Sequence, residues 1–176
     1  SLIEGTMELP DLPSIALREG KGVPHGWVEA VIAMTPERLQ ELGREFLDRT
    51  RVQRKTDRPF YIDKLPNNWI YTGLIHLILP NAKIIDARRH PLDCCFSNFR
   101  QHFAKGQAFS YSLSDMGRYY SDYVRLMAHF DAVLPGRVHR VIHEQLIDDP
   151  QAQVRAMLDY LGVRSEEHTS ELQSPD

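Results

Sequence analysis

Two scarcities in this sequence restrict the class of protein. Its 176 residues contain no apolar run approaching the roughly 20 residues that a membrane-spanning helix needs, and no segment has the pattern of a signal peptide. The two cysteines, Cys94 and Cys95, are adjacent on a predicted helix, where their side chains diverge and cannot form an unstrained disulfide. We therefore expect a soluble, cytoplasmic protein without a membrane partner, in which both thiols are reduced and serve as small core residues.

Two kinds of ligand motif are also missing. A nucleotide kinase holds phosphates with a GxxxxGK[ST] loop, which this sequence lacks, so a kinase would need such a loop upstream of Ser1. His76, His90, His102 and the cysteine pair do not have the spacing of zinc ligands. The sequence therefore predicts no metal site.

The charge balance argues against nucleic acid as a partner. The formal net charge is −3, from 21 Lys and Arg against 24 Asp and Glu. Residues 164–176 are polar and without periodicity, and their RSEEHTSELQS stretch is the translation of a sequencing-adapter sequence, so we expect a non-native tail. Removing its one basic and four acidic residues leaves 20 against 20, so the cationic side chains must act locally.

The order of apolar patterns predicts an α/β fold, with a mostly parallel sheet in a three-layer arrangement between helices. Apolar runs predict buried strands at 60–62, 84–87 and 138–142, and helices are expected after Thr35-Pro36, after Asn67 or Asn68, from Pro91, over 113–134 and from Pro150. The residues expected to face inward on four of these helices are Leu39, Leu42, Phe46 and Leu47; Trp69, Ile70, Leu74, Leu77 and Ile78; Met116, Tyr120, Tyr123, Met127 and Phe130; and Val154, Leu158 and Leu161. In such sheets, ligands bind beyond the carboxyl ends of the strands.

The most informative stretch runs from Ile84 to Phe99, where a strand, a basic turn and a helix follow one another. Residues 88–90, Arg-Arg-His, concentrate positive charge between the strand end and the helix start, which is a suitable place to hold phosphate. Ser97 follows Arg89 by eight residues and shares a helical stripe with Asp93, so its hydroxyl could reach a group held by the guanidinium.

This arrangement resembles the 3′-phosphate site of sulfotransferases that use 3′-phosphoadenosine-5′-phosphosulfate (PAPS). The segment YIDKLPNNW resembles the Asp-Lys-x-Pro element of bacterial TPR-linked sulfotransferases and the Asn-Lys-Asp-Pro element of tyrosylprotein sulfotransferases. The resemblance implies a P-loop-NTPase-like sulfotransferase fold, with Arg89 and Ser97 on the 3′-phosphate of PAPS. It implies that Lys64 contacts the departing phosphate and sulfuryl oxygens, and that TPR repeats lie upstream in the parent protein.

Two further segments extend the resemblance. The segment 3–13, IEGTMELPDLP, is similar to a family segment whose glutamate acts as general base, and the matching residue is Glu8, with Glu4 and Asp11 as nearby competitors. In VIHEQLIDDP, His143 takes the place of a family tyrosine near the adenine ring. A histidine at a strand end without any ligand explains that position equally well.

The implied reaction is in-line transfer of a sulfuryl group from PAPS to a hydroxyl or amine acceptor, without a metal. The acceptor is not indicated. The family's loop around the 5′-phosphosulfate and its later segment are missing, so we expect residues 1–163 to be a partial sulfotransferase domain with little activity alone. Two alternatives remain: a nucleotide or small-molecule kinase of related fold, and a noncatalytic binding domain whose Arg88 and Arg89 pair with acids such as Asp86 and Asp93.

Overall fold

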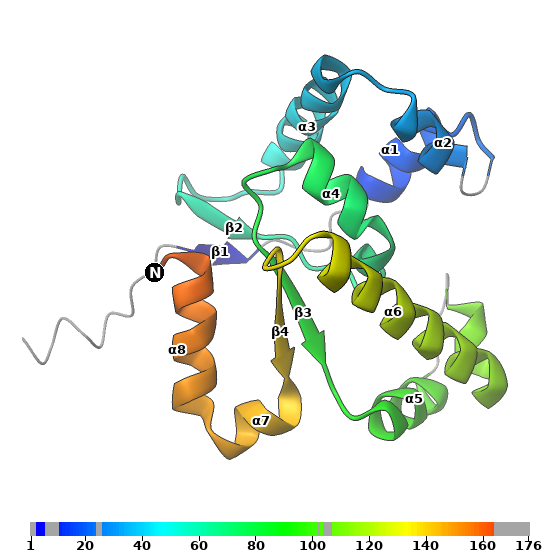
Figure 1. Ribbon diagram of the computed structural model, residues 1–176, viewed down its shortest axis with the longest axis vertical. Coiled ribbons are helices and arrows are strands. Elements are labelled where there is room, and N and C mark those ends of the chain that lie inside the picture. Colours follow the sequence, from blue (N-terminus) through cyan, green and yellow to red (C-terminus); the bar gives the residue numbers. More distant parts are fainter. Residues whose placement is uncertain (1–2, 6–10, 24–25, 102, 104–106, 164–176) are drawn as a thin grey trace, which may run out of the picture. The chain divides into compact units, whose positions relative to one another are not determined.

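A computed structural model describes residues 3–5, 11–23, 26–101, 103 and 107–163, and the chain divides into two compact units. Unit 1 comprises Ser1–Ala82 and unit 2 comprises Lys83–Asp176. In each unit, two parallel strands pair in the part that the structure describes (Figure 1). The chain therefore has the predicted α/β architecture with parallel strand pairing.

Unit 1 contains two short strands and four α-helices in its described ranges. These elements are β1 (Ile3–Gly5), α1 (Asp11–Glu19), α2 (Gly26–Ile32), α3 (Pro36–Arg51), β2 (Phe60–Ile62), the 3-10 helix η1 (Asn68–Tyr71) and α4 (Thr72–Ile78). The start of α3 is as predicted, because the Thr35 hydroxyl accepts from the Arg38 N–H at 3.3 Å and Pro36 is in the first turn. The helix expected after Asn67 or Asn68 begins as η1 at Asn68, without a capping hydrogen bond from the Asn67 side chain, and α4 starts at Thr72.

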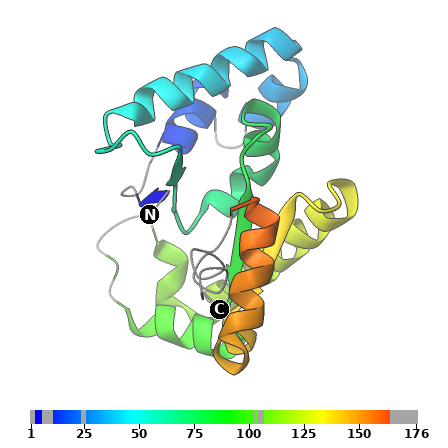
Figure 2. The same ribbon diagram turned by 90° about the vertical axis from the view of Figure 1, so that its left-hand side faces the viewer.

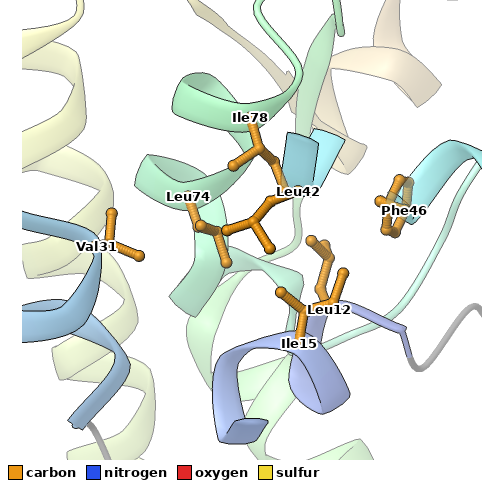
Figure 3. Close-up of a cluster of buried hydrophobic side chains, with 7 residues drawn as sticks. All are labelled: Leu12, Ile15, Val31, Leu42, Phe46, Leu74 and Ile78. Atoms are coloured by element: carbon orange, nitrogen blue, oxygen red, sulfur yellow. The ribbon is translucent and has the colours of Figure 1, made fainter. Parts of the chain in front are cut away.

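The core of unit 1 is a cluster of buried apolar side chains from its helices (Figure 3). Its members are Leu12, Ile15, Val31, Leu42, Phe46, Leu74 and Ile78. Two leucines predicted to face inward are partly exposed, Leu47 at 38% and Leu77 at 45%. The buried stripe of α3 instead includes Gly43, where an added Cβ would lie 2.0 Å from the Ile78 carbonyl oxygen. The backbones of α3 and α4 therefore meet directly at this glycine.

Burial of β2 is lower than predicted. Phe60 and Ile62 are 48% and 52% exposed, so the face that they share is largely open in unit 1. Tyr61 points to the other face, where the Arg54 guanidinium lies 4.8 Å from its ring centre. Only this second face of the short strand is packed.

Unit 2 has the predicted strands and helices in the predicted order, with two short helices, over 108–111 and 143–148, that were not predicted. Its elements are β3 (Ile84–Arg88), α5 (Pro91–Arg100), the 3-10 helix η2 (Ala108–Tyr111), α6 (Leu113–Val133), β4 (Val138–Ile142), α7 (His143–Asp148) and α8 (Pro150–Leu161). The strands pair in parallel, from Ile84 opposite Val138 to Arg88 opposite Ile142. Helices α6 and α8 lie on opposite sides of the strand pair (Figures 1 and 2). Unit 2 thus has three layers.

The burial pattern of β3 differs from the prediction. Ile85, predicted to be buried, is 40% exposed and Ala87 is exposed, whereas Asp86 between them is only 7% exposed. Alternate strand residues face opposite sides, and on the side of α6 the Asp86 carboxylate accepts a hydrogen bond from the Tyr123 hydroxyl. Val154 on α8 is also 40% exposed.

The two cysteines are half-buried free thiols on α5, not core residues. Burial raises the pKa of the Cys95 thiol, with a smaller contribution from the neighbouring Cys94. Both side chains therefore lie at the edge of the packed region of unit 2.

Tyr160 on α8 ties the amino ends of both strands together. Its hydroxyl accepts a hydrogen bond from the Ile84 N–H at 3.0 Å and donates one to the Arg137 carbonyl at 2.7 Å. Its ring stacks on His139, with ring centres 5.1 Å apart. One side chain thus satisfies backbone groups at the start of β3 and just before β4.

None of the helices in the described ranges combines the length and the apolar character needed to cross a bilayer.

Candidate functional site

The two strands of unit 2 end side by side, and the candidate site lies where the chain leaves them. Arg88 and Ile142 are the last paired residues of β3 and β4. Because the strands are parallel, the segments that follow, 89–90 and 143–144, leave from the same edge of the sheet. This is the edge at which open α/β sheets bind their ligands.

Arg88 faces the interior of unit 2. Its guanidinium lies 2.8 Å from Asp86 Oδ2, with only 14% of the Arg88 side chain and 5% of the Asp86 side chain exposed. The same carboxylate accepts from the Tyr123 hydroxyl and lies 3.3 Å from the Arg140 Nε. Arg88 also sits over the Tyr123 ring, 4.9 Å from its centre. Arg88 therefore neutralises a buried carboxylate. This is the pairing with Asp86 that the alternative of a noncatalytic binding domain predicted for Arg88.

Arg89 faces solvent. Half of its side chain is exposed, and its guanidinium lies 4.0 Å from Asp93 Oδ2, one helical turn away on α5. Such a pair of exposed side chains is weak and screened by salt. Ser97 is exposed one further turn along α5. A guanidinium just before a helix and an exposed hydroxyl on that helix are both suitable groups for binding a phosphate from solvent.

The backbone between Arg89 and α5 is held by side chains from other elements. The His90 N–H donates to Glu144 Oε1 at 3.0 Å, and the Tyr120 hydroxyl donates to the Arg89 carbonyl at 3.4 Å. The hydrogen bond from His90 lowers the pKa of the Glu144 carboxyl, and the Glu144 backbone N–H contributes further. Glu144 is therefore ionised at neutral pH.

His143 and Lys64 lie at strand ends, as the sequence predicts. His143 is exposed and starts α7 directly after β4. Lys64 is exposed in unit 1, two residues after β2 ends at Ile62. Because Lys64 and Arg89 belong to different units, their convergence on one ligand stays a prediction. Glu8, the expected general base, lies outside the described residues.

Glu144 and Arg140 did not emerge from the sequence as functional or structural residues of this edge. The strand register could have indicated Glu144. Once β3 and β4 are paired in parallel up to Arg88 and Ile142, His90 and Glu144 each lie two residues beyond the paired segment. That pairing cannot be read from either segment alone.

A family model described as "Sulfotransferase family" matches residues 21–167, which is most of the chain. The chain belongs to the sulfotransferase family. The match includes Lys64, Arg89, Ser97 and His143, whereas Glu8 precedes it. The sequence-based resemblance to sulfotransferases is thereby confirmed.

Two relatives place this sulfotransferase chain in context. It is 30% identical over 180 residues to an uncharacterised protein of Aquifex aeolicus (strain VF5). This alignment covers 97% of the chain and 24% of that protein. It shares its fold with the sulfotransferase domain from the curacin biosynthetic pathway, at a TM-score of 0.52 and 17% identity, over 98% of the chain and 62% of that domain. The chain thus spans about a quarter of the first protein and less than two thirds of the second. The likeness to the solved domain establishes the sulfotransferase fold.

Proposed function

We propose that the protein to which this chain belongs transfers a sulfuryl group from PAPS to a hydroxyl or amine acceptor. The proposal rests on family membership together with one observation, the exposed Arg89 guanidinium at the carboxyl edge of the unit 2 sheet. Its neighbour Arg88 is occupied by Asp86, so the two arginines have different roles. Arg89 is the cation that a ligand can reach.

Arg89 and Ser97 would hold the 3′-phosphate of PAPS. A guanidinium forms two parallel hydrogen bonds to phosphate oxygens, and the exposed Ser97 hydroxyl can donate a third. The Asp93 carboxylate 4.0 Å away would have to yield to the phosphate, which costs little because that pair is exposed. His143, exposed at the same edge, would stack on the adenine or hydrogen-bond to it.

Lys64 and Glu8 would act on the reacting group. Bound PAPS supplies an activated sulfuryl group, whose bond to the bridging phosphate oxygen breaks as the acceptor oxygen or nitrogen bonds to sulfur. Lys64 would stabilise the negative charge that develops on the bridging oxygen of the leaving adenosine 3′,5′-bisphosphate. Glu8 would take the acceptor proton, for which a partly desolvated carboxylate is suited. These roles of the chain need positioning and cationic charge rather than covalent catalysis.

The surroundings of the reaction stay predictions. The acceptor could be any hydroxyl or amine that fits beside Lys64. A cytoplasmic location is expected from the sequence composition alone, and TPR repeats upstream of this region are expected from the family resemblance alone.

Isothermal titration of the 176-residue chain with adenosine 3′,5′-bisphosphate tests the donor site. We expect binding that weakens in Arg89→Ala, because the phosphate loses its bidentate partner. The matched control is Arg118→Ala, an exposed arginine on α6 of the same unit, which is 78% exposed beside Asp115. This control should bind like the unmodified chain.

The same titration separates the alternatives. Preference for ATP with Mg²⁺ over the bisphosphate would favour a kinase, and no binding by a folded chain would favour a noncatalytic domain. In the parent protein, Lys64→Ala should abolish transfer from labelled PAPS while bisphosphate affinity falls less, with Lys55→Ala as an exposed cationic control in unit 1. Full transfer activity in Lys64→Ala would contradict the assigned role.

A further inference from the structure

The Glu144 carboxylate continues the hydrogen bonding between β3 and β4 after the strands have separated. The paired register ends with Arg88 opposite Ile142, so two more residues on each side would bring His90 opposite Glu144. At that position the Glu144 side chain accepts the His90 N–H at 3.0 Å. A side-chain oxygen thus takes the place that a backbone carbonyl holds within the sheet.

The bond fixes a peptide unit that carries Arg89. The carbonyl of this unit belongs to Arg89 and accepts from the Tyr120 hydroxyl at 3.4 Å, a longer contact than the one to Glu144. The N–H of the same unit belongs to His90. Both ends of one planar peptide are therefore held, by α6 on one side and by α7 on the other. Since the plane is adjacent to the Arg89 Cα, its orientation sets the direction in which that side chain leaves the backbone.

We propose that Glu144 is a positioning residue for the Arg89 anion site, which it organises by holding the Arg89–His90 peptide without touching the ligand. This inference rests on the proposed function, because it supposes that Arg89 binds the 3′-phosphate. A side chain whose backbone is already fixed loses less freedom when it binds, so the contact raises affinity through preorganisation.

The negative charge of Glu144 makes the direction of the affinity change informative. A carboxylate near an anion site repels the anion, so if Glu144 acted by charge alone, its removal would tighten phosphate binding. If it acts by holding the peptide, its removal weakens phosphate binding. The direction of the change therefore distinguishes positioning from electrostatics.

The test compares adenosine 3′,5′-bisphosphate with AMP, which lacks the 3′-phosphate, in titrations of the full chain. Glu144→Ala should weaken bisphosphate binding by roughly fivefold, the effect of one net hydrogen bond, and leave AMP binding unchanged. Glu144→Gln keeps an oxygen acceptor without the charge and should recover most of the affinity. Asp148→Ala removes an exposed carboxylate at the other end of the same short helix and serves as the control.

Repeating the Glu144→Ala substitution in the Arg89→Ala variant tests whether the effect of Glu144 depends on Arg89. In Arg89→Ala, the further change Glu144→Ala should cost nothing more, because the side chain that it positions is gone. An equal loss in both backgrounds would indicate a general structural defect and overturn the proposal, as would tighter or unchanged bisphosphate binding in the single variant.

Amide hydrogen exchange at His90 separates failure of this inference from failure of the proposed function. The His90 N–H should be protected in the unmodified chain and exchange faster in Glu144→Ala. If the unmodified chain binds AMP and the bisphosphate equally, the proposed 3′-phosphate site is wrong, and this inference falls with it even where protection is seen. If the bisphosphate is preferred but His90 is unprotected, the proposed function stands and the role of Glu144 is wrong.

Discussion

The Asp86 carboxylate lies 2.8 Å from the Arg88 guanidinium inside unit 2, where neither charge is well hydrated. Tyr123 and Arg140 complete the surroundings of the carboxylate. Because an ionised group taken out of water is costly unless it is paired, each partner here depends on the other. This pair also explains why one of two consecutive arginines faces inward and leaves the other to solvent.

Removing the buried acid should destabilise unit 2 strongly. Asp86→Ala leaves the Arg88 guanidinium buried without its counter-charge, and we expect a loss of about 3 kcal/mol in the free energy of unfolding. Urea denaturation measures it. Asp93→Ala, which removes a 60% exposed acid 4.0 Å from Arg89, should change stability by less than about 0.5 kcal/mol. Similar losses in the two variants would mean that Asp86 is not a buried ion-pair partner.

Stability should fall in alkaline solution through Tyr123. Burial first, and then the hydrogen bond to Asp86, raises the pKa of the Tyr123 phenol well above its ordinary value of 10.0. The unfolded chain therefore releases this proton first, so the stabilisation is complete below about pH 10 and disappears as the pH rises toward the folded pKa.

Tyr123→Phe should flatten this pH dependence of the unfolding free energy. Part of the loss of stability at alkaline pH should remain in this variant, because burial also raises the pKa of the Tyr120 phenol. Denaturation curves at pH 8 to 11 provide the measurement; parallel pH profiles for the variant and the unmodified chain would contradict the assignment.

Two glycine substitutions should have opposite effects. Gly43→Ala places a methyl group 2.0 Å from the Ile78 carbonyl oxygen, so α3 and α4 must separate, at a cost of about 2 kcal/mol or more. Gly117→Ala lies within α6, where a Cβ meets nothing within 4 Å. It should stabilise by roughly 0.5–1 kcal/mol, since alanine favours helix. Thermal denaturation of both variants checks the two signs.

Loss of the Tyr160 hydroxyl should weaken the start of the strand pair. Tyr160→Phe leaves the Ile84 N–H and the Arg137 carbonyl without their side-chain partner, at a cost of about 1–3 kcal/mol. The Ile84 amide should also exchange faster. Tyr111→Phe removes an exposed hydroxyl that donates to Phe103 and should cost less. An unchanged exchange rate of the Ile84 amide in Tyr160→Phe would contradict the hydrogen bond from Ile84 to the Tyr160 hydroxyl.

Element boundaries in this chain were predictable where the signal is local. Thr35-Pro36 starts α3, and Pro91 and Pro150 lie in the first turns of α5 and α8, because a fixed φ and a missing N–H suit that position. The strands predicted at 84–87 and 138–142 followed from short apolar runs, and their parallel pairing followed from the helices between them.

Side-chain environments that depend on distant partners were not predictable. The buried Asp86 has its hydrogen-bond partner Tyr123 37 positions later in the sequence, and Glu144 accepts from a backbone N–H 54 positions earlier. Hydrophobic periodicity carries no information on such pairs, so it assigned Ile85 to the interior and treated Arg88 like Arg89. The sequence thus predicted a candidate site at the end of β3, whereas the side chains that contact its backbone could be identified only from the structure.

Tyr160 and Glu144 fasten the same two strands at opposite ends, one before the ladder begins and one after it finishes. The ladder has five residue pairs, and the contacts at its two ends add to the burial pattern that specifies its alignment. Slippage by one residue would turn Asp86 outward and break both end contacts at once. A misaligned strand pair would therefore lose the burial of Asp86 together with the contacts of Tyr160 and Glu144.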